Sequence, residues 1–284
     1  MMRITSWLAP LALLLSPFAA TAQQEQAEAQ PEEEAFDGVP WQAQIYSGGS
    51  NWTPEELEQR DGWDLAHKCG GSLIAPGWVL TAAHCINANR VKNGYRVRLG
   101  ASTIDRDEGA TYRIDRFVAH ALYDNKRKAY DVALIHFVPD ELTFEDDAGP
   151  TEAIELYDGP PLDPGVAVYA TGWGKDDKDA VGYQADLTQV DLTTVDCAKY
   201  PQNKGWTQNY HLCAAAPDND TCEGDSGGPL VMEDDRPMLV GVVNFGFGCY
   251  KKDSAGVYLR IDGTYFHDWI RRAMAADPSV SQLP

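Results

Sequence analysis

The chain has 284 residues, 44% of them hydrophobic, and carries 43 acidic against 23 basic side chains, a formal net charge of −20. An acidic surface of this kind disfavours binding to nucleic acid and to anionic membranes. It would attract basic substrates from a distance, although salt screens that attraction within about 8–10 Å.

The first residues have the pattern of a secretory signal peptide. Arg3 precedes an apolar run, Trp7–Leu15, and the small-x-small sequence Ala20-Thr21-Ala22 follows. The apolar run is shorter than the about 20 residues that span a bilayer. We therefore predict a signal peptide over residues 1–22, a mature chain that starts at Gln23, and a secreted or periplasmic protein.

A short acidic segment lies between this leader and the region that we expect to fold. Residues 23–37 are mostly Gln, Glu and Ala, a composition that cannot bury a core, and we expect a disordered arm there. Order should begin at Gly38–Gln42. A polar insertion, Ser47–Asp64, follows, in which Thr53 and Pro54 would cap and start a short helix.

The middle of the chain alternates apolar and polar residues between turns, as strands do. The first group of predicted strands is Gly71–Ile74, Trp78–Thr81, Arg96–Leu99, Tyr112–His120 and Val132–Phe137. The second group is Ala167–Gly172, Thr188–Leu192, His211–Ala214, Pro229–Met232, Met238–Val243 and Gly256–Arg260. Between them lies a connection rich in Asp, Glu, Gly and Pro, Asp140–Pro164. The last predicted element is a helix, Tyr265–Met274, whose Phe266, Trp269 and Ile270 share one face.

Six cysteines in an exported protein are most simply three disulfides. Six cysteines allow 15 sets of pairings, and the sequence alone does not choose among them. A metal site is the weaker reading, because the chain has no Cys-x-x-Cys or His-x-x-x-His pair. We expect no metal.

One stretch stands out by its local sequence: Thr221–Leu230 reads Thr-Cys-Glu-Gly-Asp-Ser-Gly-Gly-Pro-Leu. Its glycines permit a sharp turn that could expose the Ser226 hydroxyl and aim nearby N–H groups at one point. A bare serine is a poor nucleophile, so it needs a base and a group that orients the base. Leu80–Cys85 supplies His84 and the segment that begins at Asp131 supplies an aspartate, in the chain order His, Asp, Ser.

These three motifs and their order resemble the chymotrypsin-like (trypsin family) serine proteases, over roughly residues 38–275. The resemblance implies an all-β fold of two six-stranded antiparallel β-barrels with a C-terminal helix. Residues 276–284 would form a C-terminal tail. The disulfides that the resemblance implies are Cys69–Cys85, Cys197–Cys213 and Cys222–Cys249.

The resemblance also assigns roles in the chemistry. His84 would take the proton of Ser226 as its oxygen attacks a carbonyl, and would then protonate the leaving amine. Asp131 would hold the imidazole in the required tautomer. The backbone N–H groups of Gly224 and Ser226 would form the oxyanion hole, worth about 10²–10³ in rate per donor. No cofactor is needed, and we expect four further histidines to be structural: His120, His136, His211 and His267.

A specificity pocket follows from the position of Asp220, six residues before Ser226. Trypsin-like members keep a carboxylate there at the base of the pocket, where it pairs with a basic side chain. Gly246 and Gly256 match the glycines of the pocket walls. We therefore predict cleavage after Arg or Lys, with Asp218 as the alternative carboxylate if the register is shifted by two residues.

Two departures from the family pattern lie near these residues. The usual Ser-Trp-Gly is here Asn244-Phe245-Gly246. We expect the Asn244 amide to donate a hydrogen bond to Asp131, and Phe245 to keep an aromatic wall. The loop that binds calcium in trypsins matches here only at Glu108, so we expect no calcium there.

The activation segment departs further. Family members usually release an Ile-Val-Gly-Gly terminus, whose ammonium pairs with the aspartate before the catalytic serine, here Asp225. This chain has no such sequence, and no Lys or Arg between Ile4 and Gln59. An unpaired buried carboxylate would cost several kcal/mol. Three partners for Asp225 remain open: His67, an internal Lys or Arg, or a terminus released by a non-tryptic cut, for example before Phe36.

The sequence thus predicts a secreted, monomeric endopeptidase that acts on proteins or peptides containing Arg or Lys. Protein inhibitors are further expected partners; nucleic acid and membranes are not. The alternatives are a latent or weak protease, and a binding protein that has kept the three residues for structural reasons. A working enzyme should react at Ser226 with a fluorophosphonate, whereas a pure binding module should tolerate Ser226→Ala.

Overall fold

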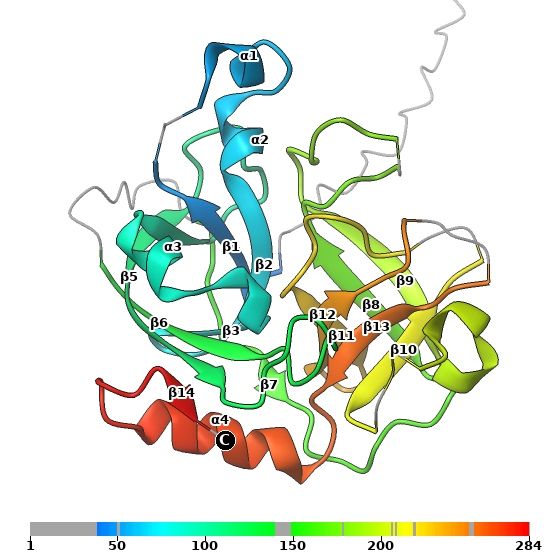
Figure 1. The fold of residues 1–284 in the computed structure, drawn as a ribbon. Coiled ribbons are helices and arrows are strands. Elements are labelled where there is room, and N and C mark those ends of the chain that lie inside the picture. Colours follow the sequence, from blue (N-terminus) through cyan, green and yellow to red (C-terminus); the bar gives the residue numbers. More distant parts are fainter. Residues whose placement is uncertain are drawn as a thin grey trace, which may run out of the picture. The chain divides into compact units, whose positions relative to one another are not determined.

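The computed structural model describes residues 39–49, 52–139, 149–177, 179–205, 207, 209–217, 220–249 and 253–283. These residues belong to one compact unit. The predicted signal peptide (1–22) and acidic arm (23–37) lie outside the described residues. Within the unit, two groups of strands form two neighbouring barrels (Figure 1). The predicted all-β fold of two six-stranded antiparallel barrels with a C-terminal helix is confirmed.

Six antiparallel strands build the first barrel. They are β1 (Gln42–Ser47), β2 (His67–Ala75), β3 (Trp78–Thr81), β4 (Tyr95–Leu99), β5 (Ala110–His120) and β6 (Ala133–Pro139). Their spatial order is β5-β4-β1-β2-β3-β6, and β5 pairs with β6 to close the barrel. Alternate side chains point inward, and Ile45, Val97 and Leu134 are fully buried there. β1 begins at Gln42, where the stretch predicted to start the fold ends.

The second barrel repeats this plan. Its strands are β8 (Ala167–Gly172), β9 (Thr188–Val195), β10 (His211–Ala215), β11 (Pro229–Glu233), β12 (Pro237–Phe245) and β13 (Gly256–Arg260). They follow the order β11-β8-β9-β10-β13-β12, and β11 pairs with β12 to close the barrel. Val168, Leu212 and Leu230 belong to its core.

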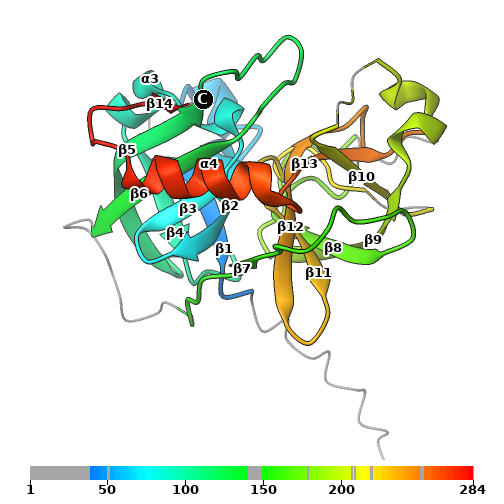
Figure 2. The ribbon, with the colours of Figure 1, turned by 90° about the horizontal axis from the view of Figure 1, so that it is seen from below.

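Helix α4 (Thr264–Ala275) follows the second barrel and packs against β6 of the first barrel (Figure 2). The helix buries Phe266, Trp269, Ile270 and Ala273, as the predicted apolar face requires.

Two short parallel strands extend the sheets: β7 (Glu155–Leu156) pairs with β12, and β14 (Gln282–Leu283) pairs with β5. The described part of the predicted tail, residues 276–283, is therefore fastened to the first barrel. The Leu283 carbonyl accepts from Trp269 Nε1 at 2.7 Å and from the Ala121 N–H at 3.0 Å.

The insertion between β1 and β2 contains two short helices, α1 (Pro54–Leu57) and α2 (Gly62–Ala66). The predicted N-cap is confirmed. Thr53 Oγ1 accepts from the Glu56 N–H at 3.2 Å, and the Glu56 carboxylate accepts from the Thr53 N–H at 2.7 Å, which forms a capping box. The other short helices in the described part of the chain are η1 (Ala83–Cys85), α3 (Ala88–Lys92), η3 (Cys197–Lys199) and η4 (Pro201–Asn203).

The three disulfides are Cys69–Cys85, Cys197–Cys213 and Cys222–Cys249, as predicted. The first joins β2 to η1 and the second joins η3 to β10. Among the helices of the described residues, none has the length and apolar character needed to cross a bilayer.

Candidate active site

His84 and Asp131 meet because neighbouring strands of the first barrel deliver them. β3 leads into η1, which carries His84, and β6 begins just after Asp131; Thr81 of β3 pairs with Ala133 of β6. The Asp131 carboxylate is fully buried. It accepts from the His84 backbone N–H at 2.8 Å and from His84 Nδ1 at 2.7 Å. Since a carboxylate only accepts, Nδ1 carries the proton and Nε2 is left to act as a base.

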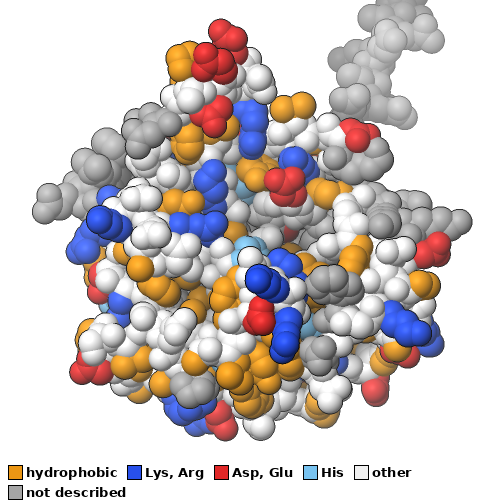
Figure 3. All heavy atoms as spheres, viewed as in Figure 1, with side chains coloured by type: hydrophobic (Ala, Val, Ile, Leu, Met, Phe, Trp, Pro, Cys, Tyr) orange, Lys and Arg blue, Asp and Glu red, His pale blue; other side chains and the backbone are white. Residues whose placement is uncertain are grey.

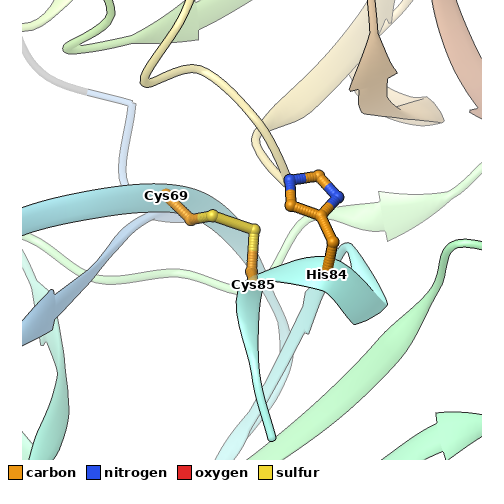
Figure 4. Close-up of side chains that lie close together, drawn as sticks. All are labelled: Cys69, His84 and Cys85. Carbon is orange, nitrogen blue, oxygen red and sulfur yellow. A yellow bond between two sulfur atoms is a disulfide. The ribbon is translucent and has the colours of Figure 1, made fainter. Parts of the chain in front are cut away.

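The Cys69–Cys85 disulfide fixes the turn that carries His84. Figure 4 shows the imidazole and the disulfide leaving this turn in different directions. One ligand atom from each of Cys69, His84 and Cys85 lies within 4.8 Å of the others, a spacing that would suit a metal. The two sulfurs are bonded to each other, however, and a disulfide offers no thiolate to a metal. The disulfide in this cluster therefore stabilises the turn that carries His84.

The Ser226 loop of the second barrel is tied directly to the first. The Ser226 carbonyl accepts from the Gly70 N–H of β2 at 2.9 Å and lies 3.6 Å from Cys85 Sγ, next to His84 in the chain. The Gly228 N–H donates to the Asp225 carbonyl at 2.9 Å, which closes the turn that the glycines permit. Ser226 remains partly exposed. The Ser226 loop thus lies beside the turn that carries His84, and His84 in turn bonds Asp131.

Gly224 has a backbone that few other residues could adopt. Its φ is +106°, and a Cβ there would lie 2.8 Å from the Tyr183 ring and 2.9 Å from Gly174 Cα. Its N–H and that of Ser226 belong to the same turn as the serine hydroxyl. These two N–H groups are the predicted donors to an oxyanion.

Asp225 is held by backbone groups. Its carboxylate accepts from the Gly174 N–H at 2.9 Å and from the Cys222 N–H at 2.8 Å. Burial raises the pKa of Asp225 to about 6, although both N–H donors oppose that shift. Among the three partners left open by the sequence, His67 is not bonded to Asp225: its Nε2 lies 3.0 Å from the Gly224 carbonyl oxygen. Backbone donors carry no sequence signature, which is why the sequence did not indicate them.

The Asp220 side chain lies against Gly256, one of the two glycines that were predicted to line the specificity pocket. A Cβ on Gly256 would meet Asp220 Oδ1 at 2.9 Å and Tyr258 Oη at 2.8 Å. The Thr221 and Tyr258 hydroxyls lie 3.1 Å apart beside it. Around Gly246, a Cβ would meet no atom within 4 Å, so this glycine borders open space. Burial raises the pKa of Asp220 to about 7. The alternative carboxylate, Asp218, lies outside the described residues.

Asn244 differs from the prediction. Its Nδ2 lies 3.4 Å from His211 Nε2, so the amide contacts this histidine and not Asp131. Phe245 packs edge-on against the His211 ring, with centroids 5.7 Å apart. His211 is buried, and that burial lowers its pKa to about 4, so it is neutral at pH 7. A lone histidine at the start of a strand gave no sign of this contact.

The Glu108 carboxylate is hydrogen-bonded to other residues of its own loop. Its carboxylate accepts from the Ser102 N–H at 2.9 Å, the Ser102 hydroxyl at 2.8 Å and the Thr103 N–H at 3.2 Å. The loop that matches the calcium loop at one position is thus stabilised by hydrogen bonds.

Comparison with known proteins agrees with this geometry. The profile of the family described as Trypsin matches residues 27–270. "Trypsin epsilon" of Drosophila erecta is 32% identical over 244 residues, 84% of each chain, and "Trypsin" of Simulium vittatum is 36% identical over 203 residues, 69% of this chain and 77% of that one. Neuropsin, a serine protease of mouse brain, superposes with a TM-score of 0.66 at 26% identity, covering 84% of this chain and 96% of its own. The chain therefore belongs to the trypsin family of chymotrypsin-like serine proteases.

Proposed function

We propose that this protein is a secreted serine endopeptidase that cleaves peptide bonds after Arg or Lys. The observation that carries the chemistry is the fully buried Asp131 carboxylate, which bonds His84 through both oxygens. Such a carboxylate fixes the ring and stabilises the imidazolium that forms when a proton arrives at Nε2. A histidine that was kept only for packing would not need hydrogen bonds that fix its ring in this orientation.

In the proposed reaction, the Ser226 oxygen attacks the scissile carbonyl while its proton passes to His84 Nε2. The carbonyl oxygen becomes an oxyanion that the N–H groups of Gly224 and Ser226 stabilise. His84 then gives its proton to the amine as the C–N bond breaks, which leaves an acyl group on Ser226. A water molecule, deprotonated by His84, attacks the acyl carbon; the bond from that carbon to the Ser226 oxygen then breaks, His84 returns the proton to this oxygen, and the acid is released.

The preference for Arg and Lys is supported by Asp220. Its carboxylate lies against a wall glycine, Gly256, where a larger residue would contact it. A substrate guanidinium or ammonium bound beside this buried carboxylate would form a charge pair with it. Because the carboxyl has a pKa of about 7 in the absence of substrate, its negative charge is complete only at mildly alkaline pH.

The net charge of −20 does not describe every face of the molecule. On the face seen in Figure 3, Lys and Arg side chains gather about the centre. Long-range attraction of basic substrates by an acidic surface is therefore no part of this proposal; the specificity rests on the pocket.

The test is hydrolysis of paired peptide amides that end in Arg, Lys, Phe or Glu, by protein beginning at Gln23, with Ser226→Ala as control. Mass spectrometry of the N-terminus would accompany it. Fast cleavage after Arg and Lys that the substitution abolishes supports the proposal. Failure to cleave all four peptides, with no labelling of Ser226 by a fluorophosphonate, would favour the alternative of a latent or binding protein.

A further inference from the structure

The insertion between β1 and β2 is built around a single buried carboxylate. Asp64 of α2 is 4% exposed, whereas the other residues of α1 and α2 are partly or fully exposed. Arg60 compensates its charge: Nε lies 2.5 Å from Oδ2 and Nη2 lies 2.7 Å from Oδ1. Although burial opposes ionisation, these bonds hold the pKa of Asp64 below its usual value. The pair is bidentate, which fixes its geometry.

The same carboxylate reaches a loop of the second half of the chain. Asp64 Oδ1 accepts from the Tyr183 N–H at 2.8 Å, and the Arg60 guanidinium stacks 4.9 Å from the Tyr183 ring centre. Tyr183 lies in the loop between β8 and β9. The base of that loop is closed by a bond from the Gln184 N–H to the Trp173 carbonyl at 3.0 Å.

Tyr183 in turn packs on the residues that shape the proposed oxyanion hole. Its ring meets His67 edge-on, with centroids 4.9 Å apart, and covers Gly224 so closely that a Cβ there would clash. His67 is fully buried, and its Nδ1 lies 3.3 Å from Gln44 Nε2. Because this amide nitrogen donates to Nδ1, the ring proton sits on Nε2 and is donated to the Gly224 carbonyl.

The other end of the loop fixes the peptide group before Gly224. The Lys175 N–H donates to the Glu223 carbonyl at 2.9 Å, and Lys175 Nζ lies 2.8 Å from the Glu223 carboxylate. In a trans peptide the carbonyl and the following N–H point in opposite directions. Holding the Glu223 carbonyl on this loop therefore aims the Gly224 N–H away from the loop.

We infer that Asp64 and Arg60 are positioning residues for the oxyanion hole: they anchor the Tyr183 loop, which with His67 holds Gly224 in the orientation that donates to substrate. The contact of both residues with the hole runs through Tyr183. They are part of the chain from synthesis onward, so their effect requires no cleavage. The inference rests on the proposed protease function.

The test compares Asp64→Asn and Asp64→Ala with Asp61→Asn, an exposed aspartate in the same insertion whose side chain makes no cap bond. Asn can still accept from the Tyr183 N–H, so we expect Asn to retain more activity than Ala. On an Arg peptide amide, kcat should fall by about tenfold for Asn and about a hundredfold for Ala, because a misplaced donor is felt mainly in the transition state. The KM should change by less than about threefold.

Two inhibitors separate this role from general destabilisation. Affinity for a peptide boronate with an Arg side chain, whose adduct places an oxygen in the hole, should fall in parallel with kcat. Affinity for benzamidine, which reports only on the cationic pocket, should stay within about twofold. Equal loss of both affinities, or unchanged kcat in a folded Asp64→Ala variant, overturns the inference. If the wild-type chain does not cleave the peptide at all, the proposed function fails first and the inference falls with it.

Discussion

Replacing Asp220 by Ser tests the specificity pocket, and the structure sets the size of the effect. The carboxylate is largely desolvated, and a bound Arg side chain would complete its burial. Removing one member of a buried charge pair costs about 3–5 kcal/mol. Because Asp220 is still partly exposed in the free chain, we take the lower figure. At 1.36 kcal/mol per tenfold, about 3 kcal/mol corresponds to a fall of about 150-fold in kcat/KM.

The assay is the ratio of kcat/KM for an Arg peptide amide to that for the matched Phe peptide amide, which cancels changes in the catalytic groups. In the wild-type chain this ratio should rise about tenfold between pH 6 and pH 8, because Asp220 ionises with a pKa of about 7. Asp220→Ser should lower the ratio at pH 8 by about 150-fold and remove its pH dependence. Asp191→Ser, an equal charge change on the exposed side of β9, should do neither. A ratio that stays within threefold of wild type in Asp220→Ser would refute the pocket assignment.

Three further predictions concern the pocket wall and the stability of the fold. Gly256→Ala should lower kcat/KM for Arg substrates at least tenfold, because the added Cβ meets the Asp220 carboxylate and the Tyr258 hydroxyl. Labelling of Ser226 by a small fluorophosphonate should continue. Unchanged hydrolysis of the Arg peptide would contradict this prediction. Burial lowers the pKa of His120 to about 4 in the folded chain. As pH falls below about 6.5, this imidazole binds a proton in the unfolded chain before it can do so in the folded chain, so the free energy of unfolding should decrease between pH 6.5 and 4. In urea unfolding, His120→Gln should reduce that loss by about 1–2 kcal/mol; an identical pH dependence would argue against it. Replacing Cys197 and Cys213 by Ala should cost about 3 kcal/mol, because the disulfide closes a loop of sequence separation 16; an unchanged urea midpoint would show that the bond adds no stability.

Much of the fold was predictable because local chemistry and tertiary structure agree. The strand over Trp78–Thr81 and the strand over Gly256–Arg260 have the predicted bounds, since their apolar runs end at turns. Helix α4 buries the predicted face. The strand at Gln282–Leu283 was not predicted, because two residues show no alternation and the pairing depends on Trp269 and β5.

The parts of the candidate site that could be predicted are those in which a side chain within a recognisable sequence motif supplies the chemistry. His84 and Asp131 lie far apart in sequence but are bonded as expected. The partners of Asp225 are backbone N–H groups, and any residue can supply those. Asn244 was expected at Asp131, but a buried histidine two strands away in the same barrel, His211 of β10, contacts its amide instead. Such contacts depend on strand register and not on local sequence.

The most direct test is active-site titration with an ester of 4-guanidinobenzoic acid, which requires the nucleophile, its base and the cationic pocket together. One equivalent of the alcohol should be released per chain in a rapid burst, and mass spectrometry should find the 4-guanidinobenzoyl group on Ser226. Ser226→Ala should give no burst, and Asp220→Ser should slow it. Absence of a burst from the folded wild-type chain, or an acyl group found on another residue, would contradict the proposed mechanism.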